Sequence, residues 1–399
     1  MPWLSREAAR DLREGLGSLM LCNLGDYVSG AFLHLFKPLI EKAPIIIALL
    51  PAASDARGDV YSSYGSRLGS LLHLGLLSRH RRQELETLAA VIVAVNAWIG
   101  LLVALLAAAM GRSLDPLDAV FVSLSSAAAS AAVMVPATTL LAVKSFQHGL
   151  DPDNLVAPIA TLFGDMVTIP SIVLGYEASA RLCAWAKLAA VAALAALAAA
   201  FAARILRRAA AGDPAYRRAA RNMKEVLGVV AASTLLSSLA GALLLANLET
   251  LLAVPGVLVV VPAFLEDGGA IATRFSSRLA TKLHLGSLAP SCRATRWVWE
   301  QVLVNMAHAA AVFTSLGVMG ALAAYYSAAP PVWCLRVLAA VLAAGLVLAA
   351  AVSLATYCLA VASFRAGLDP DNVLAPTLTS IADILGTASL VAATLLLLR

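Results

Sequence analysis

Two aspartates, Asp165 and Asp383, lie deep inside apolar stretches and follow the same short motif. The motif is Gly-Leu-Asp-Pro-Asp-Asn, and it occurs at residues 149–154 and again at residues 367–372. Each aspartate lies eleven residues beyond the asparagine of its motif. At about 1.5 Å per helical residue, this spacing places the carboxylate roughly 16 Å into a membrane span, near the middle of a hydrocarbon core about 30 Å thick. An ionisable side chain at that depth is costly, and by default it marks a pathway for ions or protons.

A second stretch is also duplicated and contains further carboxylates. Ten identical residues within 51–75 recur within 262–286 at a constant offset of 211, whereas the motif before each aspartate recurs at an offset of 218. Proline and glycine interrupt a short apolar run in both copies, which predicts a broken second span whose polar groups face a cavity. An ordinary helix end with a solvated loop is the alternative. The carboxylates of this stretch are Asp55, Asp59, Glu266 and Asp267.

The composition indicates a membrane protein. Hydrophobic residues make up 61% of the 399 residues and charged residues 13%, with a mean hydropathy of +0.84. Soluble domains are about half apolar and a quarter charged, so most of this chain is expected to lie in a lipid bilayer. The net charge of +5 comes mainly from basic residues between apolar runs, which favours a topological role and excludes a nucleic-acid partner. The five scattered cysteines predict neither disulfides nor a zinc site.

The apolar runs predict an all-α polytopic membrane protein of about eleven transmembrane helices. Each copy contains five runs, and an additional run at residues 182–205 joins them. Five spans alone would invert the second copy, whereas a linking helix gives two parallel five-helix repeats. We therefore predict a first repeat at residues 1–178, a linking segment at 179–212 and a second repeat at 213–399. Basic residues alternate between the loops in a way that predicts a cytoplasmic N-terminus and an external C-terminus in the cell membrane.

Taken together, the motifs resemble those of the membrane domain of the MgtE family of magnesium channels. In duplicated form, the chain also resembles the related solute carrier family 41 of magnesium transporters. The resemblance implies a divalent-cation pathway at a symmetry axis, formed here by two fused halves, so that a monomer is expected to function. It also implies that Asp165 and Asp383 bind the hydrated ion, and that Thr161 and Thr379 supply backbone oxygens to it. One departure is that the family's Gly-Asn turn is Gly-Asp at residues 58–59 and Gly-Ala at residues 269–270.

The chemistry of the residues agrees with Mg²⁺ as the transported ion. Magnesium prefers oxygen ligands and keeps several waters, so one or two carboxylates commonly hold it. Two aspartates at equivalent depths supply that arrangement, while no cluster of histidines or cysteines offers the softer ligands that favour zinc or copper. Mn²⁺ or Co²⁺ are further candidates, because a site for a hydrated ion discriminates by size and charge. We interpret His308 as a hydrogen-bonded packing residue.

Two alternatives and one residue stay open at this point. An intramembrane aspartyl protease would also use two buried aspartates, but its Gly-x-Gly-Asp signature is absent at Asp165 and Asp383, so we do not expect an enzyme. A sodium-coupled Mg²⁺ exchanger is the closer alternative, because a sodium site built from carbonyls and hydroxyls leaves no clear signature. Asp26, in the first span, either lines the pathway or pairs with a basic residue.

Overall fold

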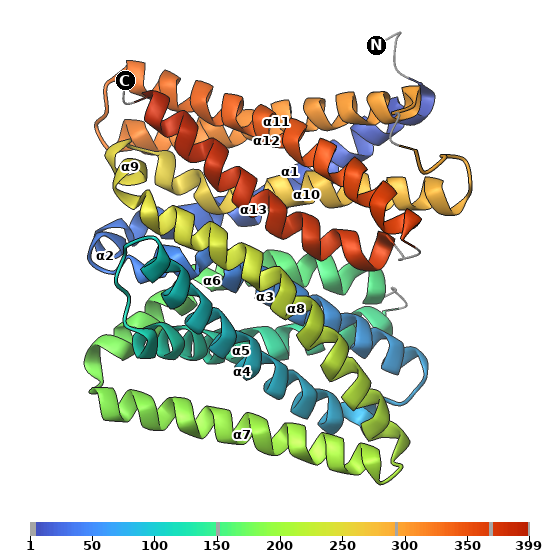
Figure 1. Cartoon of the computed structure of the whole chain (residues 1–399). Coiled ribbons are helices and arrows are strands. Elements are labelled where there is room, and N and C mark those ends of the chain that lie inside the picture. The colour runs from blue at the N-terminus through green and yellow to red at the C-terminus, as the bar shows by residue number, and fades with distance from the viewer. Residues whose placement is uncertain (1–4, 149–151, 292–293, 367–369, 398–399) are drawn as a thin grey trace. The chain divides into compact units, whose positions relative to one another are not determined.

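The computed structural model describes residues 5–148, 152–291, 294–366 and 370–397, with side chains except at positions 6, 21, 152–158, 161 and 370–373. Within these ranges the chain forms thirteen α-helices and no strand (Figure 1). Eleven of the helices have 27 to 35 residues, and the other two have six residues each. At 1.5 Å per residue, the long helices reach about 40 Å or more, which exceeds the hydrocarbon thickness of a bilayer.

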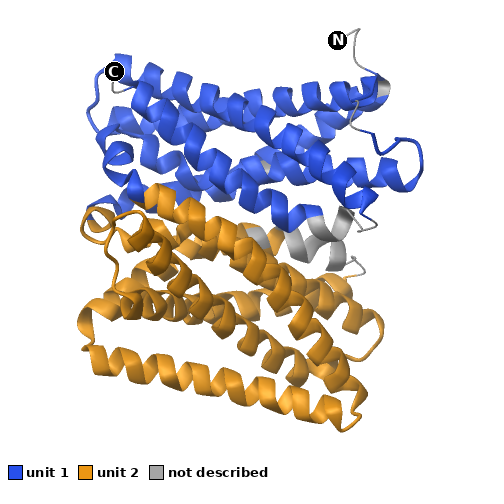
Figure 2. Cartoon of the chain, in the orientation of Figure 1, with its two compact units in different colours: residues 1–38, 246–399 blue, residues 39–245 orange. Residues whose placement is uncertain are grey.

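The chain divides into two compact units, which Figure 2 shows in different colours. Unit 1 consists of Met1–Pro38 and Ala246–Arg399, and unit 2 consists of Leu39–Leu245, with the boundary inside α2 (Lys37–Lys42). The other helices of unit 1 are α1 (Arg6–Leu35), α9 (Leu248–Ala253), α10 (Val257–His284), α11 (Arg296–Tyr326), α12 (Pro331–Arg365) and α13 (Pro370–Leu397). The other helices of unit 2 are α3 (Ile45–His73), α4 (Leu77–Ala109), α5 (Pro116–Gln147), α6 (Pro152–Arg181), α7 (Ala184–Ala210) and α8 (Pro214–Ala246).

Several of these helices have the length and composition of membrane spans. Within the described ranges, seven satisfy both requirements, namely α4, α5, α7, α8, α11, α12 and the part of α13 from Leu374 onward. The protein is therefore an all-α polytopic membrane protein, as predicted. Most of the acidic residues singled out in the sequence lie on the other long helices, α1, α3, α6 and α10. The total of eleven spans stays a prediction.

The first helix of each sequence copy packs with the second helix of the other copy. In unit 1, α1 lies against α10, and in unit 2, α8 lies against α3. A β-carbon at Gly30 would overlap the carbonyl oxygen of Val259, and one at Gly241 would overlap that of Ala48. The same offset of 211 that relates the sequence copies also relates these two contacts. Both helix pairs therefore have the same register, and each compact unit contains helices from both copies.

Glycine is required where these backbones meet, and this requirement gives a stability prediction. We expect Gly30→Ala and Gly241→Ala each to destabilise the protein by about 1–3 kcal/mol, because the added methyl group meets a carbonyl oxygen. Gly17→Ala is the matched control, since a β-carbon at Gly17 in α1 would have nothing within 4 Å. Thermal unfolding of the purified variants measures the effect. A loss of stability in the control equal to that in Gly30→Ala would contradict the contact.

The second spans are longer and more regular than the sequence predicts. α3 continues through Pro51 and Gly58 without a break, and α10 continues through Pro262. The prediction of broken helices is therefore wrong. A proline removes one backbone hydrogen bond, and neighbouring helices can satisfy the freed group, so the helix persists. The carboxylates of these spans consequently project from intact helices, and two of them, Asp55 and Asp59, accept hydrogen bonds from the helix packed alongside.

A helix, α7, lies where the linking helix is predicted, and it packs against α4 and α5. Lys187 of α7 contacts Asp118 of α5 at 2.5 Å, and Arg204 contacts Glu86 of α4 at 2.8 Å. Of the most apolar 18-residue window in α7, 6% is buried inside the protein. An apolar helix with so much free surface is suited to a position at the border with lipid, which agrees with a helix that joins two repeats without entering either core.

Candidate ion-binding site

Asp383 lies on α13 where this helix packs closely against α10. A β-carbon at Gly269 would come within 3.3 Å of Thr379 Cγ2, and one at Gly268 would come within 3.6 Å of Ala382 Cβ. Asp383 follows directly in the chain and is 6% exposed. The two glycines let the second span of this copy approach the turn of α13 that carries the predicted ion ligand. The Asp383 carboxylate is therefore held inside unit 1 and not at a loop.

The equivalent position in unit 2 is more open. Asp165 is half-buried on α6, and a β-carbon at its neighbour Gly164 would lie 4.0 Å from Arg57 Cβ on α3. Thr379 of the other copy donates its hydroxyl hydrogen bond to the Pro376 carbonyl at 3.1 Å, within α13. The side chain of Thr161, by contrast, lies outside the described residues. Asp165 and Asp383 belong to different units, so their pairing stays a prediction.

Arg57 is a charged residue near the candidate site that the sequence analysis missed. It is 5% exposed and donates hydrogen bonds to Ser126 at 3.0 Å and Ser130 at 3.1 Å, both on α5. Arg57 lies beside the turn of α6 that carries Asp165, since a β-carbon at Gly164 would come within 4.0 Å of Arg57 Cβ. The counterpart of Arg57 at the offset of 211 is Gly268, so only one copy has this cation. A comparison of the two copies residue by residue could have found it.

The carboxylates on α3 bond to the first helix of the other copy. The Ser233 hydroxyl of α8 donates to Asp59 Oδ2 at 3.1 Å, and the Ser237 hydroxyl donates to Asp55 Oδ2. Both aspartates are half-buried. These bonds explain why α3 remains helical around its polar residues. They also show that the carboxylates point toward a neighbouring helix and not into a break in their own.

The carboxylates on α10 are more deeply placed. Asp267 is 0% exposed, whereas the adjacent Glu266 is half-buried. Among the described residues, no group of three or more histidine, cysteine, aspartate or glutamate side chains is arranged to hold a metal ion. A hydrated Mg²⁺ requires only one or two carboxylates, so this finding is compatible with such an ion.

One protein family matches both sequence copies. The sequence model of MgtE, described as a divalent cation transporter, matches residues 50–175 and 261–393. The chain belongs to the MgtE family of divalent cation transporters. The two matches begin 211 residues apart and end 218 residues apart, which are the same offsets that relate the duplicated motifs. A search of curated proteins found no match, and a search of solved structures found none either.

The MgtE match includes Asp165 and Asp383. It does not include α1 or α8, the two first helices that are exchanged, in the sense that each packs with the second helix of the other copy.

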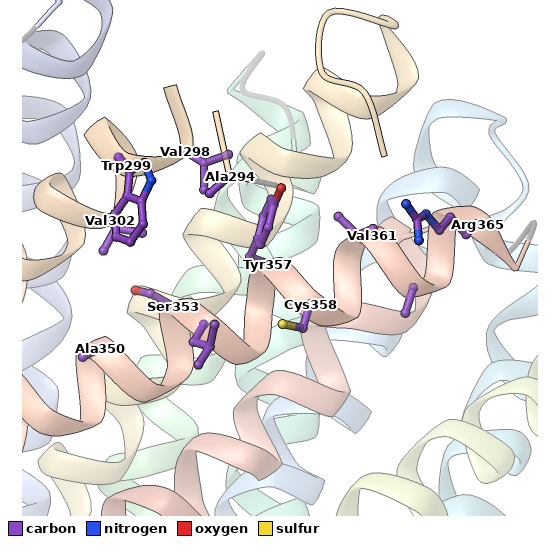
Figure 3. Close-up of a pocket in the computed structure, with 12 residues that line it drawn as sticks. Ala294, Val298, Trp299, Val302, Ala350, Ser353, Tyr357, Cys358, Val361 and Arg365 are labelled. Atoms are coloured by element: carbon purple, nitrogen blue, oxygen red, sulfur yellow. The ribbon is translucent and has the colours of Figure 1, made fainter. Parts of the chain in front are cut away.

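Two cavities in unit 1 lie apart from the aspartates of the matched regions. A cavity of about 780 Å³ between α11 and α12 is lined mostly by apolar side chains, with Trp299, Tyr357 and Arg365 among them (Figure 3). Another, of about 700 Å³, lies between α1, α10 and α11. Such apolar linings suit lipid chains better than a hydrated cation, so neither cavity is a candidate for the ion site of this MgtE protein.

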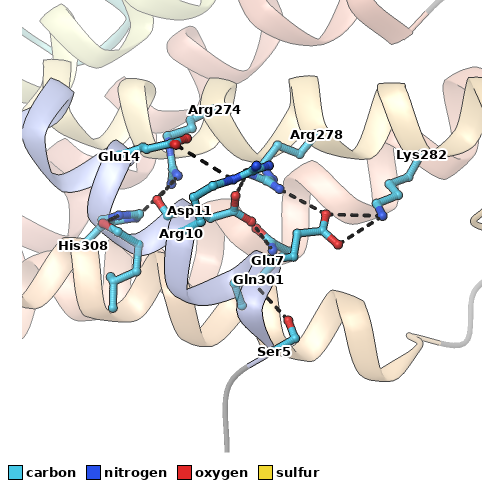
Figure 4. Close-up of polar contacts among 12 residues, drawn as sticks. Ser5, Glu7, Arg10, Asp11, Glu14, Arg274, Arg278, Lys282, Gln301 and His308 are labelled. Atoms are coloured by element: carbon cyan, nitrogen blue, oxygen red, sulfur yellow. Dashed lines mark hydrogen bonds and ion pairs between the residues drawn. The ribbon is translucent and has the colours of Figure 1, made fainter.

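A polar network ties the beginning of α1 to α10 in unit 1 (Figure 4). Glu7 pairs with Arg278 and with Lys282 at 3.3 Å each, and Arg278 also pairs with Asp11. Asp11 is 1% exposed, and its second carboxylate oxygen accepts a hydrogen bond from Gln301 at 3.1 Å. These contacts hold the exchanged helix in place at the end opposite Gly30.

His308 continues this network through both of its ring nitrogens. Arg274 donates to His308 Nδ1 at 3.0 Å, and His308 Nε2 donates to the Leu12 carbonyl at 3.0 Å. The imidazole is fully buried. His308 is therefore a hydrogen-bonded packing residue, as the sequence predicted.

Proposed function

We propose that the chain transports Mg²⁺ across the membrane through a pathway to which both sequence copies contribute. In this proposal Asp165 and Asp383 bind one hydrated ion jointly, and Thr161 and Thr379 supply backbone oxygens one helical turn earlier. The observation that carries the proposal is the duplication: each matched region of the MgtE family contains one of the two aspartates at the same position within its copy. The burial of Asp383 against α10 supports a functional reason for keeping a carboxylate at that depth.

The ligand chemistry supports a hydrated dication. Two carboxylates offset the double charge of Mg²⁺, and retained waters complete its octahedral shell. Mn²⁺ and Co²⁺ are secondary candidates by the same chemistry. The half-buried Asp55, Asp59 and Glu266, together with Asp267, add negative potential on the second spans, which raises the local cation concentration. A single chain carries both halves, so the proposed transporter is a monomer.

Flux through the reconstituted protein tests this function and separates it from sodium-coupled exchange. Purified protein in liposomes, with a Mg²⁺ indicator inside, is given a Mg²⁺ gradient with and without a sodium gradient. Mg²⁺ entry without sodium supports a channel-like pathway, whereas entry only against a sodium gradient supports the exchanger. Absence of Mg²⁺ movement under both conditions, from protein that is folded and inserted, would refute the proposed function.

The proposed orientation has a cytoplasmic N-terminus and an external C-terminus. An odd number of spans and the alternation of basic loops support it. Single cysteines placed at Ser5 and Arg399 in a variant without native cysteines are labelled in intact cells with an impermeant reagent. We expect labelling at position 399 and not at position 5. Equal labelling of both positions would contradict the eleven-span topology.

A further inference from the structure

The helices α1 and α10 run antiparallel in unit 1, and their register fixes the level of Asp26. Four pairs of residues meet across the two helices, and in each pair the residue numbers add up to 289. The pairs are Glu7 with Lys282, Asp11 with Arg278, Gly15 with Arg274 and Gly30 with Val259. At this register Asp26 lies level with Ala263, and Glu266 and Asp267 lie on the next turn of α10. Asp26 and Gly30 are four residues apart, so they share the face of α1 that meets α10.

The equivalent position in unit 2 shows how a carboxylate is satisfied there. The offset of 211 relates Asp26 to Ser237 and Glu266 to Asp55. In unit 2, the Ser237 hydroxyl donates a hydrogen bond to the Asp55 carboxylate. In unit 1, an aspartate stands in place of that serine. A hydrogen-bond donor is thus replaced by a second acceptor that also carries a negative charge.

The carboxylate of Asp26 is buried, and one of its two oxygens, Oδ2, has no hydrogen-bond partner among the described residues. Its side chain is 2% exposed. The carboxylates whose charges act on it are Asp267 and, more weakly, Glu266. Arg274, seven residues beyond Asp267 on the same helix, already donates to the Asp11 carbonyl and to His308. Like charges buried together at membrane depth are strongly disfavoured unless a cation joins them or a shared proton neutralises one of them.

We propose that Asp26 and Glu266 bind a small hard inorganic cation between them, either Na⁺ or Mg²⁺. In unit 2, the Ser237 hydroxyl donates a hydrogen bond to Asp55. In unit 1, the cation takes the place of that hydroxyl proton between Asp26 and Glu266. Carboxylate oxygens select hard cations over softer metals. Because Asp26 and Asp267 are closed off from solvent, the ion is held by direct contact and without a complete water shell. Asp267 adds negative potential to the site.

This site differs from the proposed pair of Asp165 and Asp383 in two ways. It occurs in one unit only, and its ion is partly dehydrated. Its ligand class rests on the proposed cation transport, but its binding can be measured separately from flux. A second cation site in one half gives the transporter a place for a coupling or structural ion that sequence duplication alone does not predict.

The test uses the variant Asp165→Asn/Asp383→Asn as a background, so that the transport site does not contribute. Thermal unfolding of the purified protein is measured in NaCl, in MgCl₂ and in N-methylglucamine chloride at equal ionic strength. We expect the background protein to unfold at a higher temperature in at least one of the inorganic salts than in the organic one. The salt with the larger effect identifies the ion.

Asp26→Ser, added to this background, gives unit 1 the serine that unit 2 has at the equivalent position. The substitution removes a buried charge and supplies a hydrogen-bond donor, so it favours folding. We expect this variant to be more stable than the background in the organic salt and to lose the cation-dependent rise. The reciprocal Ser237→Asp should gain a cation-dependent rise that Ser237→Ala does not gain. These paired changes test the site in both units.

Three results would overturn the proposal. The first is equal unfolding temperatures of the background protein in all three salts. The second is an undiminished cation response after Asp26→Ser. The third is a stability that follows pH at this site but not the inorganic cation, which would assign a shared proton to the pair. Mg²⁺ flux through the wild-type chain is recorded alongside, so failure of this site is distinguishable from failure of the proposed function.

Discussion

Asp383→Asn is expected to lower Mg²⁺ flux through the reconstituted protein by about a hundredfold or more. At an effective dielectric near 20, a unit charge about 5 Å from a dication contributes roughly 6 to 7 kcal/mol of gross attraction. Even if desolvation and screening remove half of it, the remaining loss of about 3 kcal/mol exceeds a hundredfold in binding. Asp165→Asn is expected to act in the same direction, and the double variant should add little to either single one.

The control for this experiment is a neutralised aspartate outside the candidate site. Asp115 is exposed and caps α5 by accepting a hydrogen bond from the Leu117 N–H at 2.8 Å. Asparagine caps helices as well as aspartate does, so Asp115→Asn should leave both stability and flux nearly unchanged. Flux is measured in liposomes with an internal Mg²⁺ indicator, and protein insertion is checked for every variant.

The folded state of the variants decides how the flux result is interpreted. Asparagine has nearly the same shape as aspartate, and removing a buried charge relieves a desolvation cost, so Asp383→Asn should unfold at or above the wild-type temperature. Near-normal flux in Asp383→Asn would show that the pathway does not depend on this carboxylate. Loss of folded protein would show instead that the residue is structural.

Much of the fold could be predicted because the chain contains two copies of one pattern. The apolar run at residues 182–205 forms the helix Ala184–Ala210, because a long apolar run free of acidic residues has few alternatives in a membrane, whereas its role as a link between two repeats stays a prediction. The exchange of α1 and α8 between the copies could not be predicted. Both copies have similar sequences, so nothing in either one states which second span its first helix will contact. Gly30 and Gly241 indicate which second span each first helix contacts only when the structure places Val259 and Ala48 beside them.

The sequence also does not state which helix lies beside each second span, and this explains why the predicted break in these spans is wrong. Polar residues between Ser54 and Arg67 shorten the apolar run of α3, and this pattern predicts a break. In the structure, Asp55 and Asp59 accept hydrogen bonds from Ser237 and Ser233 of α8, so the helix continues. Without knowledge of the neighbouring helix, the polar side chains had no visible partner. The positions of the candidate carboxylates were predictable from the duplication, but their partners were not.

Arg57→Gln is expected to lower the Mg²⁺ concentration that gives half-maximal flux, by roughly tenfold to a hundredfold. Arg57 is buried on α3 beside Gly164, the neighbour of Asp165 in the chain, so an ion that binds at Asp165 does so near a fixed positive charge. A unit charge about 8 Å from a dication gives roughly 4 kcal/mol of gross repulsion at an effective dielectric near 20. Glutamine removes this charge and keeps an amide donor for Ser126 or Ser130.

Two further variants distinguish this electrostatic effect from a structural one. Arg57→Lys keeps the positive charge while changing the hydrogen-bond geometry, so its half-maximal Mg²⁺ concentration should stay near that of the wild type. Combining Arg57→Gln with Asp165→Asn should abolish the gain, because the ion then lacks the carboxylate that binds it near the arginine. The second copy has Gly268 at this position, so the effect is expected at Asp165 and not at Asp383. If Arg57→Gln instead raises the half-maximal concentration, the arginine supports the pathway and does not compete with the ion.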